Sequence, residues 1–270
     1  YEAYGTWDLP EAFHPSTWVA ETVNRSIDAA ADRDQPFFIW ANFQDPHNPC
    51  FAPAPWSTLY DPDRIPRFGL KPGEPDCFRD KPAHYREIHA QPGPYTAKTS
   101  DPGLGHTGNV CRLPWTARQT QENAAHYYGM VSLLDDRIGR ILAHLDARGL
   151  ADDTLIVFTA DHGDLLGDHG FWWKSLVCYD ESIRIPWIAR WPRAMPAGRR
   201  LGFCNLVDLA PTFCAAAGEP LLPQWEGENL LPEWQGGARV RRDTLIEERP
   251  GEGDFISHIL VEDGWKMAAY

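Results

Sequence analysis

The amino-acid sequence predicts an α/β fold in which a mainly parallel sheet lies between helices. Two apolar runs, 37–43 and 154–160, have the length and the β-branched or aromatic content of buried strands. Each run follows a segment in which apolar residues recur with helical periodicity, 14–30 before the first run and 121–150 before the second. Because helix and strand alternate in this way in sheets covered by helices, we expect both runs to be interior strands of one sheet.

Both predicted helices carry signals for their ends, and the second also shows a face expected to be buried. Pro15 suits the first turn of the helix over 14–30, and Gly149 suits the end of the helix over 121–150. The apolar positions expected to bury the second helix are Val131, Leu134, Ile138, Ile141 and Leu145.

Three further elements are predicted after the second run. The segment 185–189 has the composition of a strand. A helix is expected between Asp208, as its N-cap residue, and Gly218 at its end. Residues 255–261 and 265–270 flank a Glu-Asp-Gly turn, which predicts a β-hairpin.

Residues 48–115 are predicted to be an irregular insertion near the active site. The stretch 46–114 holds 13 of the 24 prolines and shows no helical or strand periodicity. Irregular segments of this length are usually functional or disordered. Its aromatic residues favour packing on the body of the protein, so we expect a cover on the substrate side. A plain surface insertion is the alternative.

The composition and net charge of the chain limit which molecules it is expected to bind. Hydrophobic residues make up 43% of the 270 residues, enough for a packed core. The net charge of −13 argues against nucleic-acid binding, because phosphate contacts need a basic face. No apolar run approaches the roughly 20 residues of a membrane span. The composition leaves open a homo-oligomer and either a cytoplasmic or a periplasmic location, since the chain does not start with Met.

The six cysteines fit no metal or redox motif. None belongs to a Cys-x-x-Cys pair, so we expect free or buried thiols. The six are Cys50, Cys77, Cys111, Cys178, Cys204 and Cys214.

Polar side chains follow both predicted strands at their carboxyl ends. Asp161 and His162 come directly after the second run and offer oxygen and nitrogen to a divalent metal. His47 comes just after the first run, and Lys174 could bring a positive charge to an anionic substrate. Because open α/β sheets bind ligands at the carboxyl ends of their strands, we expect these four side chains to converge. Gly163 is expected to let the chain turn away without steric cost.

The second half of the chain carries a long motif. Residues 160–192 read ADHGDLLGDHGFWWKSLVCYDESIRIPWIARWP. This run resembles the second signature of the sulfatase family, part of the alkaline phosphatase superfamily, and in particular its choline-sulfatase and phosphonate monoester hydrolase members. Residues 45–49, Asp-Pro-His-Asn-Pro, are similar to a further element of that family. The resemblance implies an alkaline phosphatase-like three-layer α/β/α sandwich over 1–240, and the start of a smaller C-terminal antiparallel subdomain over 241–270.

The resemblance also implies a role for each polar side chain. Asp161 and His162 would be ligands of one divalent metal, most readily calcium or manganese by their donor types, with magnesium as a further option. His47 would donate a hydrogen bond or proton to the leaving oxygen, and Lys174 would neutralise charge on the transferred sulfuryl group. The residues implied to orient these ligands are Asp164, Asp168 and His169.

The nucleophile of the resembled family is a Cys or Ser, oxidised to formylglycine, in a Cys-x-Pro-x-Arg or Ser-x-Pro-x-Arg motif. No cysteine or serine of this chain has Pro two positions later and Arg four positions later. The resemblance therefore implies that the nucleophile lies outside these residues, in an N-terminal portion. Part of the C-terminal subdomain is expected to lie outside them as well.

Three functions are compatible with this resemblance. The first is hydrolysis of a small anionic sulfate ester by a formylglycine sulfatase. The second is a phosphonate monoester hydrolase or phosphodiesterase built on the same site, and the third is a non-catalytic protein with the sulfatase fold. The 270 residues alone are expected to be inactive and to bind metal weakly. They offer two ligands, whereas a tight calcium site has about six to eight oxygens.

Overall fold

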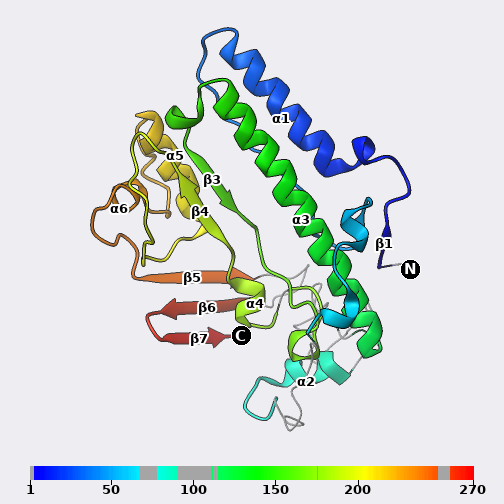
Figure 1. The fold of residues 1–270 in the computed structure, drawn as a ribbon. Helices are drawn as coiled ribbons and strands as arrows, with labels where there is room; N and C mark the ends of the chain where they lie inside the picture. Colours follow the sequence, from blue (N-terminus) through cyan, green and yellow to red (C-terminus); the bar gives the residue numbers. More distant parts are fainter. Residues whose placement is uncertain are drawn as a thin grey trace. The chain divides into compact units, whose positions relative to one another are not determined.

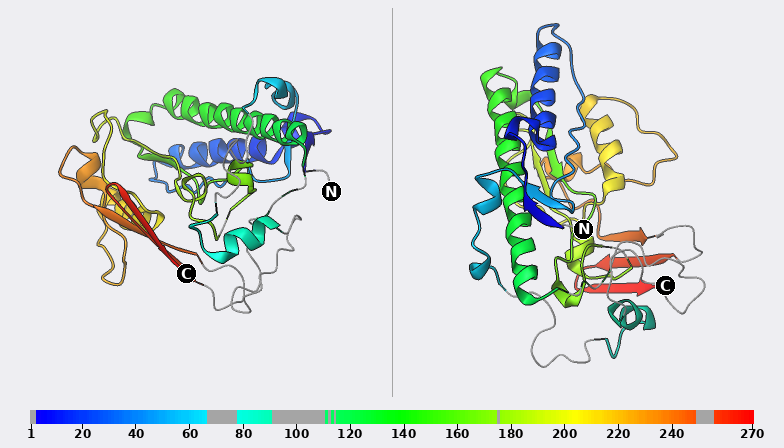
Figure 2. Two further views of the ribbon diagram at one scale, coloured as in Figure 1. Left: turned by 90° about the horizontal axis from the view of Figure 1, so that it is seen from below. Right: turned by 90° about the vertical axis from the view of Figure 1, so that its right-hand side faces the viewer.

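The computed structural model describes residues 3–66, 78–90, 111, 113, 115–174, 176–248 and 256–270 (Figure 1 and Figure 2). Its helices and strands confirm the predicted α/β class. The chain divides into two compact units. The first consists of 1–68 and 115–152, and the second of 69–114 and 153–270.

The first unit is built around two helices that lie side by side (Figure 1). Its main elements are β1 (Tyr4–Thr6), α1 (Pro15–Ala31), β2 (Cys50–Ala52) and α3 (Ala117–Ala147). His14 caps α1, because its Nδ1 accepts the Ser16 N–H at 3.3 Å while its Nε2–H donates to Phe51 O at 3.1 Å. A capping box of Thr116 and Gln119 starts α3. Both predicted helices are confirmed.

Leu145 of the predicted stripe on α3 is buried, but nearer the middle of the helix the buried face differs by one position from that stripe. Met130 and Leu133 are buried, whereas Val131 is 42% exposed. Arg137 also points inwards and is fully buried, because two carboxylates and the hydroxyl of Thr17 accept its N–H groups. The apolar pattern could not include Arg137 in the buried face, because an arginine is expected to be exposed unless partners for its charge are known.

The segment 37–43 is not a strand, contrary to the prediction. Phe38 and Trp40 are each 69% exposed, while residues 37 and 39 are half-buried. This alternation is that of extended backbone, but a strand also needs a hydrogen-bonded neighbour. Among the described residues no strand pairs with this segment, so apolar composition predicted the conformation and not the pairing. The strands that do pair in this unit, β1 and β2, run parallel.

The second unit contains the other predicted strands. β3 (Ile156–Thr159) confirms the run at 154–160 as a strand, with half-buried residues, and β4 (Trp187–Arg190) confirms the segment at 185–189. The two pair antiparallel, which corrects the parallel pairing predicted for this strand. The described part of the connection, residues 160–186, holds only the short helical elements Asp168–Gly170 and α4 and no long helix of the kind that usually joins two parallel strands.

The other elements of the second unit are short helices and one sheet. They are α2 (Ala83–Ala90), α4 (Asp180–Ile183), α5 (Leu209–Ala217), α6 (Leu231–Trp234), β5 (Asp243–Glu248), β6 (Ser257–Glu262) and β7 (Trp265–Ala269). β5, β6 and β7 form an antiparallel sheet, which confirms the predicted hairpin. Asp208 is the N-cap residue of α5 and Gly218 ends the helix with a φ of 76°, both as predicted, although the Asp208 side chain makes no capping hydrogen bond. Its carboxylate instead accepts two N–H groups of Arg241, at 2.6 and 3.0 Å.

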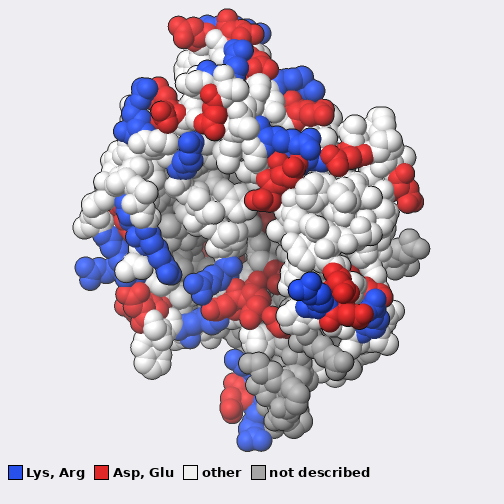
Figure 3. All heavy atoms as spheres, viewed as in Figure 1, with Lys and Arg blue, Asp and Glu red and all other residues white. Residues whose placement is uncertain are grey.

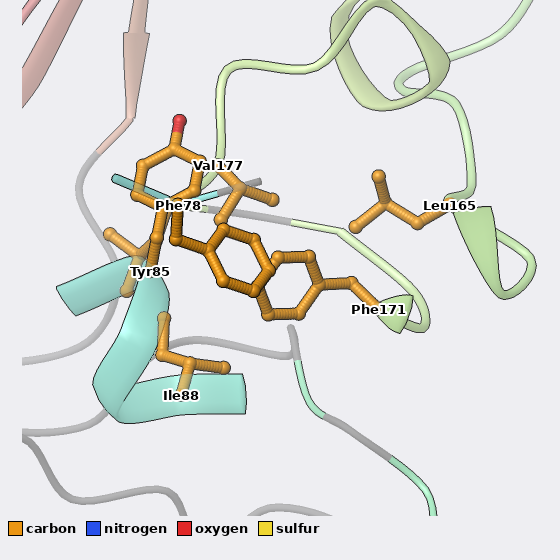
Figure 4. Close-up of a cluster of buried hydrophobic side chains, with 7 residues drawn as sticks. Phe78, Tyr85, Ile88, Leu165, Phe171 and Val177 are labelled. Atoms are coloured by element: carbon orange, nitrogen blue, oxygen red, sulfur yellow. The ribbon is translucent and has the colours of Figure 1, made fainter. Parts of the chain in front are cut away.

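α2 lies inside the insertion that was predicted to be irregular. It has two turns and directly follows Pro82 in a proline-rich stretch, so its periodicity is too short to stand out. One face of α2 contributes to a buried cluster (Figure 4). The cluster consists of Phe78, Tyr85, Ile88, Leu165, Phe171, Leu176 and Val177. Residues 67–77 and 91–110 of the insertion lie outside the described residues, and its role as a cover stays a prediction.

The structure bears on three expectations drawn from composition: the state of the cysteines, the absence of a membrane span and the distribution of charge. The cysteines within the described residues are free thiols: Cys50, Cys111, Cys178, Cys204 and Cys214. Cys77 lies outside the described residues. None of the described helices is long and apolar enough to cross a membrane. On the face drawn in Figure 3, lysine and arginine side chains lie among aspartate and glutamate.

Candidate active site

The loop that follows β3, residues 160–179, carries the predicted metal ligands, and we call it the site loop. Asp161 Oδ1 accepts the His162 N–H at 3.0 Å. His162 Nε2 lies 3.4 Å from Asp161 Oδ2, and the Asp161 side chain is 84% exposed. The two side chains therefore present oxygen and nitrogen donors close enough together to reach one ion at bond lengths of about 2.0–2.4 Å.

The second nitrogen of His162 determines where the ring carries its proton. Nδ1–H donates to Gly163 O at 2.7 Å, because a carbonyl oxygen can only accept. In the neutral ring Nε2 then keeps its lone pair. Metal-binding histidines usually have this arrangement, with the other ring nitrogen donating to a carbonyl or carboxylate. Asp161 and His162 therefore fit a divalent metal. Among the described residues, no group of three or more His, Cys, Asp or Glu side chains could hold one.

A close backbone approach explains the glycine of the Asp-His-Gly segment. A Cβ atom on Gly163 would lie 1.9 Å from Glu181 O. The Gly163 N–H donates to Ser182 O at 2.8 Å. Both partners belong to α4, so this helix braces the segment at a point where no side chain fits.

Asp164 and Lys174 interact electrostatically at this site. Asp164 Oδ1 accepts the Leu166 N–H at 2.8 Å, which ties the carboxylate to the site loop. Burial raises the pKa of Asp164, and that hydrogen bond together with His162 and Lys174 opposes the rise. Burial lowers the pKa of Lys174, while Asp161 and Asp164 favour its charged form. The predicted catalytic lysine is thus within electrostatic range of the predicted ligand Asp161.

Asp168 and His169 lie at a short helical turn, Asp168–Gly170, in which His169 takes a left-handed φ of 55°. The His169 ring stacks on Tyr179 with 3.7 Å between ring centroids. Its Nε2 lies 3.6 Å from Glu181 Oε2. Tyr179 and Glu181 lie at the start of α4, the helix that braces Gly163. The orienting role of Asp168 and His169 stays a prediction. His169 contacts Tyr179 and Glu181 at the start of α4, and α4 in turn contacts Gly163, next to the predicted ligands.

His47 belongs to the first unit, where it is exposed. Its Nδ1–H donates to Asn48 O at 2.6 Å, and its backbone N–H donates to Gln44 O at 3.0 Å. Nε2 is then the nitrogen available for a substrate. Asp161, His162 and Lys174 lie together in the second unit. The predicted approach of His47 to them involves both units and stays a prediction.

Sequence reasoning missed several side chains that contact the site loop, among them two that bind the backbone of Leu176. Glu248 Oε2 accepts the Leu176 N–H at 3.0 Å, and His84 Nε2–H donates to Leu176 O at 3.0 Å. They lie 72 and 92 positions from Leu176 and outside every motif, so no sequence signal marks them. Tyr179 and Glu181 do belong to the Tyr-Asp-Glu part of the motif, but the sequence analysis assigned no role to them.

Proteins with related sequences include several sulfatases. The chain is 29% identical over 196 residues to an arylsulfatase of Clostridium perfringens, covering 72% of this chain and 35% of that protein. It is 31% identical over 216 residues to the multifunctional alkaline phosphatase superfamily protein PehA of Trinickia caryophylli, covering 76% and 38%. A choline-sulfatase of Rhizobium meliloti is 26% identical over 238 residues, covering 86% and 42%. The chain thus spans less than half the length of these relatives.

Solved structures share the fold over nearly the whole chain. The phosphonate monoester hydrolase SpPMH from Silicibacter pomeroyi superposes with a TM-score of 0.81 at 26% sequence identity, covering 97% of this chain and 53% of that one. The profile of the sulfatase family matches residues 2–219, which include His47 and the whole site loop. Because this match covers most of the sequence, the chain belongs to the sulfatase family.

Proposed function

We propose that the whole protein hydrolyses sulfate esters with a divalent metal and a formylglycine nucleophile. The observation that carries the proposal is the geometry of the Asp-His-Gly segment. It presents the exposed Asp161 carboxylate beside a His162 ring whose Nδ1 is bound to a carbonyl. Lys174 lies in the electrostatic field of the same carboxylate. Membership of the sulfatase family and the likeness to an arylsulfatase and a choline-sulfatase support this reaction.

The residues of this chain would divide the work as follows. Asp161 and His162 would hold the metal through a carboxylate oxygen and Nε2, a donor pair that suits calcium or manganese, with magnesium also accepted. The bound ion would supply Lewis-acid polarisation of the nucleophile and the ester oxygens. Lys174 would neutralise the negative charge that grows on the sulfuryl group. His47 would give a proton to the leaving oxygen. Formylglycine, formed from a Cys or Ser outside these 270 residues, would be the nucleophile.

A second candidate is hydrolysis of phosphonate monoesters or phosphate diesters on the same site. The superposition on a phosphonate monoester hydrolase, and the likeness to the multifunctional protein PehA, favour it. Both reactions place an anionic tetrahedral group next to a metal and a lysine. The side chains described so far therefore serve either one.

A substrate panel separates these candidates. The metal-loaded whole protein is assayed with 4-nitrophenyl sulfate, bis(4-nitrophenyl) phosphate and 4-nitrophenyl phenylphosphonate. We expect the highest kcat/KM for the sulfate ester. A clear preference for the phosphonate or the diester would support the second candidate. Hydrolysis of none of the three would refute both and leave a non-catalytic protein with the sulfatase fold.

The 270-residue chain by itself is proposed to be inactive and to bind metal weakly. Asp161 and His162 supply two ligands, and water added to them brings neither a chelate effect nor a nucleophile of the required kind. The check is metal content by mass spectrometry and 4-nitrophenyl sulfate hydrolysis, for this chain beside the whole protein. Clear turnover by the short chain would mean that its own residues contain the nucleophile.

A further inference from the structure

We propose that His84 and Glu248 are positioning residues for Lys174 and act through the backbone of Leu176. This inference rests on the role of Lys174 in the proposed function. We call the two hydrogen bonds to Leu176 the clamp. His84 comes from α2 and Glu248 from β5, so the clamp reaches the site loop from two elements far apart in the sequence.

The backbone of Leu176 is held at both of its polar groups. Its N–H donates to Glu248 Oε2 at 3.0 Å, and its carbonyl accepts the His84 Nε2–H at 3.0 Å. Leu176 has a φ of 62°, a left-handed conformation that is strained for a residue with a Cβ. Its side chain is fully buried. A conformation of this kind persists where the surroundings determine it, and here the buried His84 and the half-buried Glu248 do so.

The residues after Leu176 are fixed by the same two elements. The Cys178 N–H donates to the Tyr85 hydroxyl at 2.8 Å, and Tyr85 lies next to His84 on α2. Cys178 Sγ lies 2.8 Å from the hydroxyl of Tyr270, which follows β7. Val177 belongs to the buried cluster with Tyr85 (Figure 4). α2 and the antiparallel sheet thus hold residues 176–178 together.

Lys174 lies between the clamp and a second fixed point of the site loop. On its other side, Trp173 O accepts the Leu165 N–H at 2.8 Å, and Trp173 has a φ of 66°. A lysine side chain is long and flexible, so the position of its backbone decides where the ammonium group can be placed at low cost. Electrostatic stabilisation of a transition state needs a charge that is already in place. The clamp supplies that placement without touching the substrate.

Replacing Glu248 tests the clamp, with a neighbouring residue as the matched control. Glu248→Ala removes the acceptor for the Leu176 N–H, and we expect kcat for 4-nitrophenyl sulfate to fall by about 10- to 100-fold with little change in KM. Glu248→Gln keeps a carbonyl oxygen as acceptor and should restore most of the turnover. Glu247→Ala alters the adjacent, exposed glutamate, which pairs with His258, and should behave like the wild type. Thermal melting of each variant confirms that it is folded.

A double-mutant cycle with Lys174 separates positioning from a general loss of stability. Lys174→Ala removes the group that the clamp positions, so Glu248→Ala should cost no further turnover in that background. If Glu248→Ala does not fold, His84→Asn tests the clamp from α2, because its shorter amide cannot reach Leu176 O. The same loss of kcat, absent in the Lys174→Ala background, is expected.

The outcomes distinguish this inference from the proposed function. If Lys174→Ala impairs turnover while folded Glu248→Ala and His84→Asn match the wild type, the clamp is refuted and the role of Lys174 stands. Equal additional losses in the wild-type and Lys174→Ala backgrounds would also refute the clamp. If Lys174→Ala itself turns over normally, the proposed role of Lys174 fails, and the clamp fails with it.

Discussion

Single hydrogen bonds decide what the two histidines assigned to the chemistry can do. His162 Nδ1–H donates to Gly163 O at 2.7 Å, and His47 Nδ1–H donates to Asn48 O at 2.6 Å. In both histidines Nδ1 donates to the carbonyl of the next residue, so Nε2 takes no part in that hydrogen bond. Beside the exposed Asp161 carboxylate, such a nitrogen is suited to bind metal. Among the described residues no carboxylate pairs with His47, and its Nε2 is suited to carry a proton to a leaving group.

Replacing His47 should therefore affect turnover and spare the metal. In the whole protein, His47→Ala is expected to lower kcat by about 10²- to 10⁴-fold if the residue acts as a general acid. Metal content, measured by mass spectrometry on the same samples, should equal that of the wild type. His258→Ala, at an exposed histidine paired with Glu247, is the control. Loss of metal together with turnover would assign His47 to the metal site instead.

Gly163 offers a second test at this scale. In Gly163→Ala the new methyl group would meet Glu181 O at 1.9 Å, so the Asp-His-Gly segment must move away from α4. We expect weaker metal binding and turnover lowered by about 10- to 100-fold. Gly139→Ala is the matched control, because a Cβ there meets nothing within 4 Å. In the middle of α3 that change should raise the free energy of unfolding by about 0.5–1 kcal/mol and leave turnover unchanged. Wild-type turnover in Gly163→Ala would contradict the bracing by α4.

At the scale of elements, α2 shows how a short helix can escape prediction and still organise a site. Its two turns bury His84 and Tyr85, and both side chains bind backbone groups of the site loop. Burial lowers the pKa of His84 from its ordinary value of 6.5, with the Leu176 carbonyl and Glu87 acting in the opposite sense. The neutral ring is thus the form that α2 accommodates.

This pKa shift predicts a pH dependence of stability. Because the pKa of His84 is lower in the folded chain than in the unfolded chain, the unfolded chain binds the proton first as pH falls. The stabilising contribution is therefore present above about pH 6.5 and is lost as pH falls from there through the folded-state pKa. His84→Gln keeps an N–H donor but does not titrate, so its melting temperature should fall less between pH 7 and pH 5. His258→Gln, at an exposed histidine, should follow the wild type. Identical pH profiles for His84→Gln and the wild type would contradict the buried neutral ring.

The pairing of the strands could not be predicted from composition, and the reason is physical. Apolar content located β3 and β4 but could not tell an antiparallel from a parallel partner, because pairing depends on the path of the chain between them. The same signal marked 37–43, which pairs with no strand among the described residues. The helices α1 and α3 were located by periodicity, although the buried face of α3 includes Arg137, which an apolar pattern does not mark.

Considering the whole molecule, the motif over 160–192 was enough to locate the site loop and its polar residues. It could not show the bracing of Gly163 by α4, because steric fit depends on coordinates. Nor could it show the clamp, since Glu248 and His84 reach Leu176 across 72 and 92 positions. Membership of the sulfatase family supports the reaction class. The metal, the nucleophile and the substrate remain proposals about the whole protein, because this chain spans less than half the length of the curated relatives.

The central claim is that Asp161 and His162 hold a catalytic metal, and one paired measurement tests it. Asp161→Asn and its control Asp152→Asn, at an exposed aspartate outside the site, are made in the whole protein. Metal content by mass spectrometry and hydrolysis of 4-nitrophenyl sulfate are measured on the same samples. We expect Asp161→Asn to lose bound metal and turnover together, because the neutral amide is a weaker ligand, while Asp152→Asn retains both. Full metal content and full turnover in Asp161→Asn would contradict the claim.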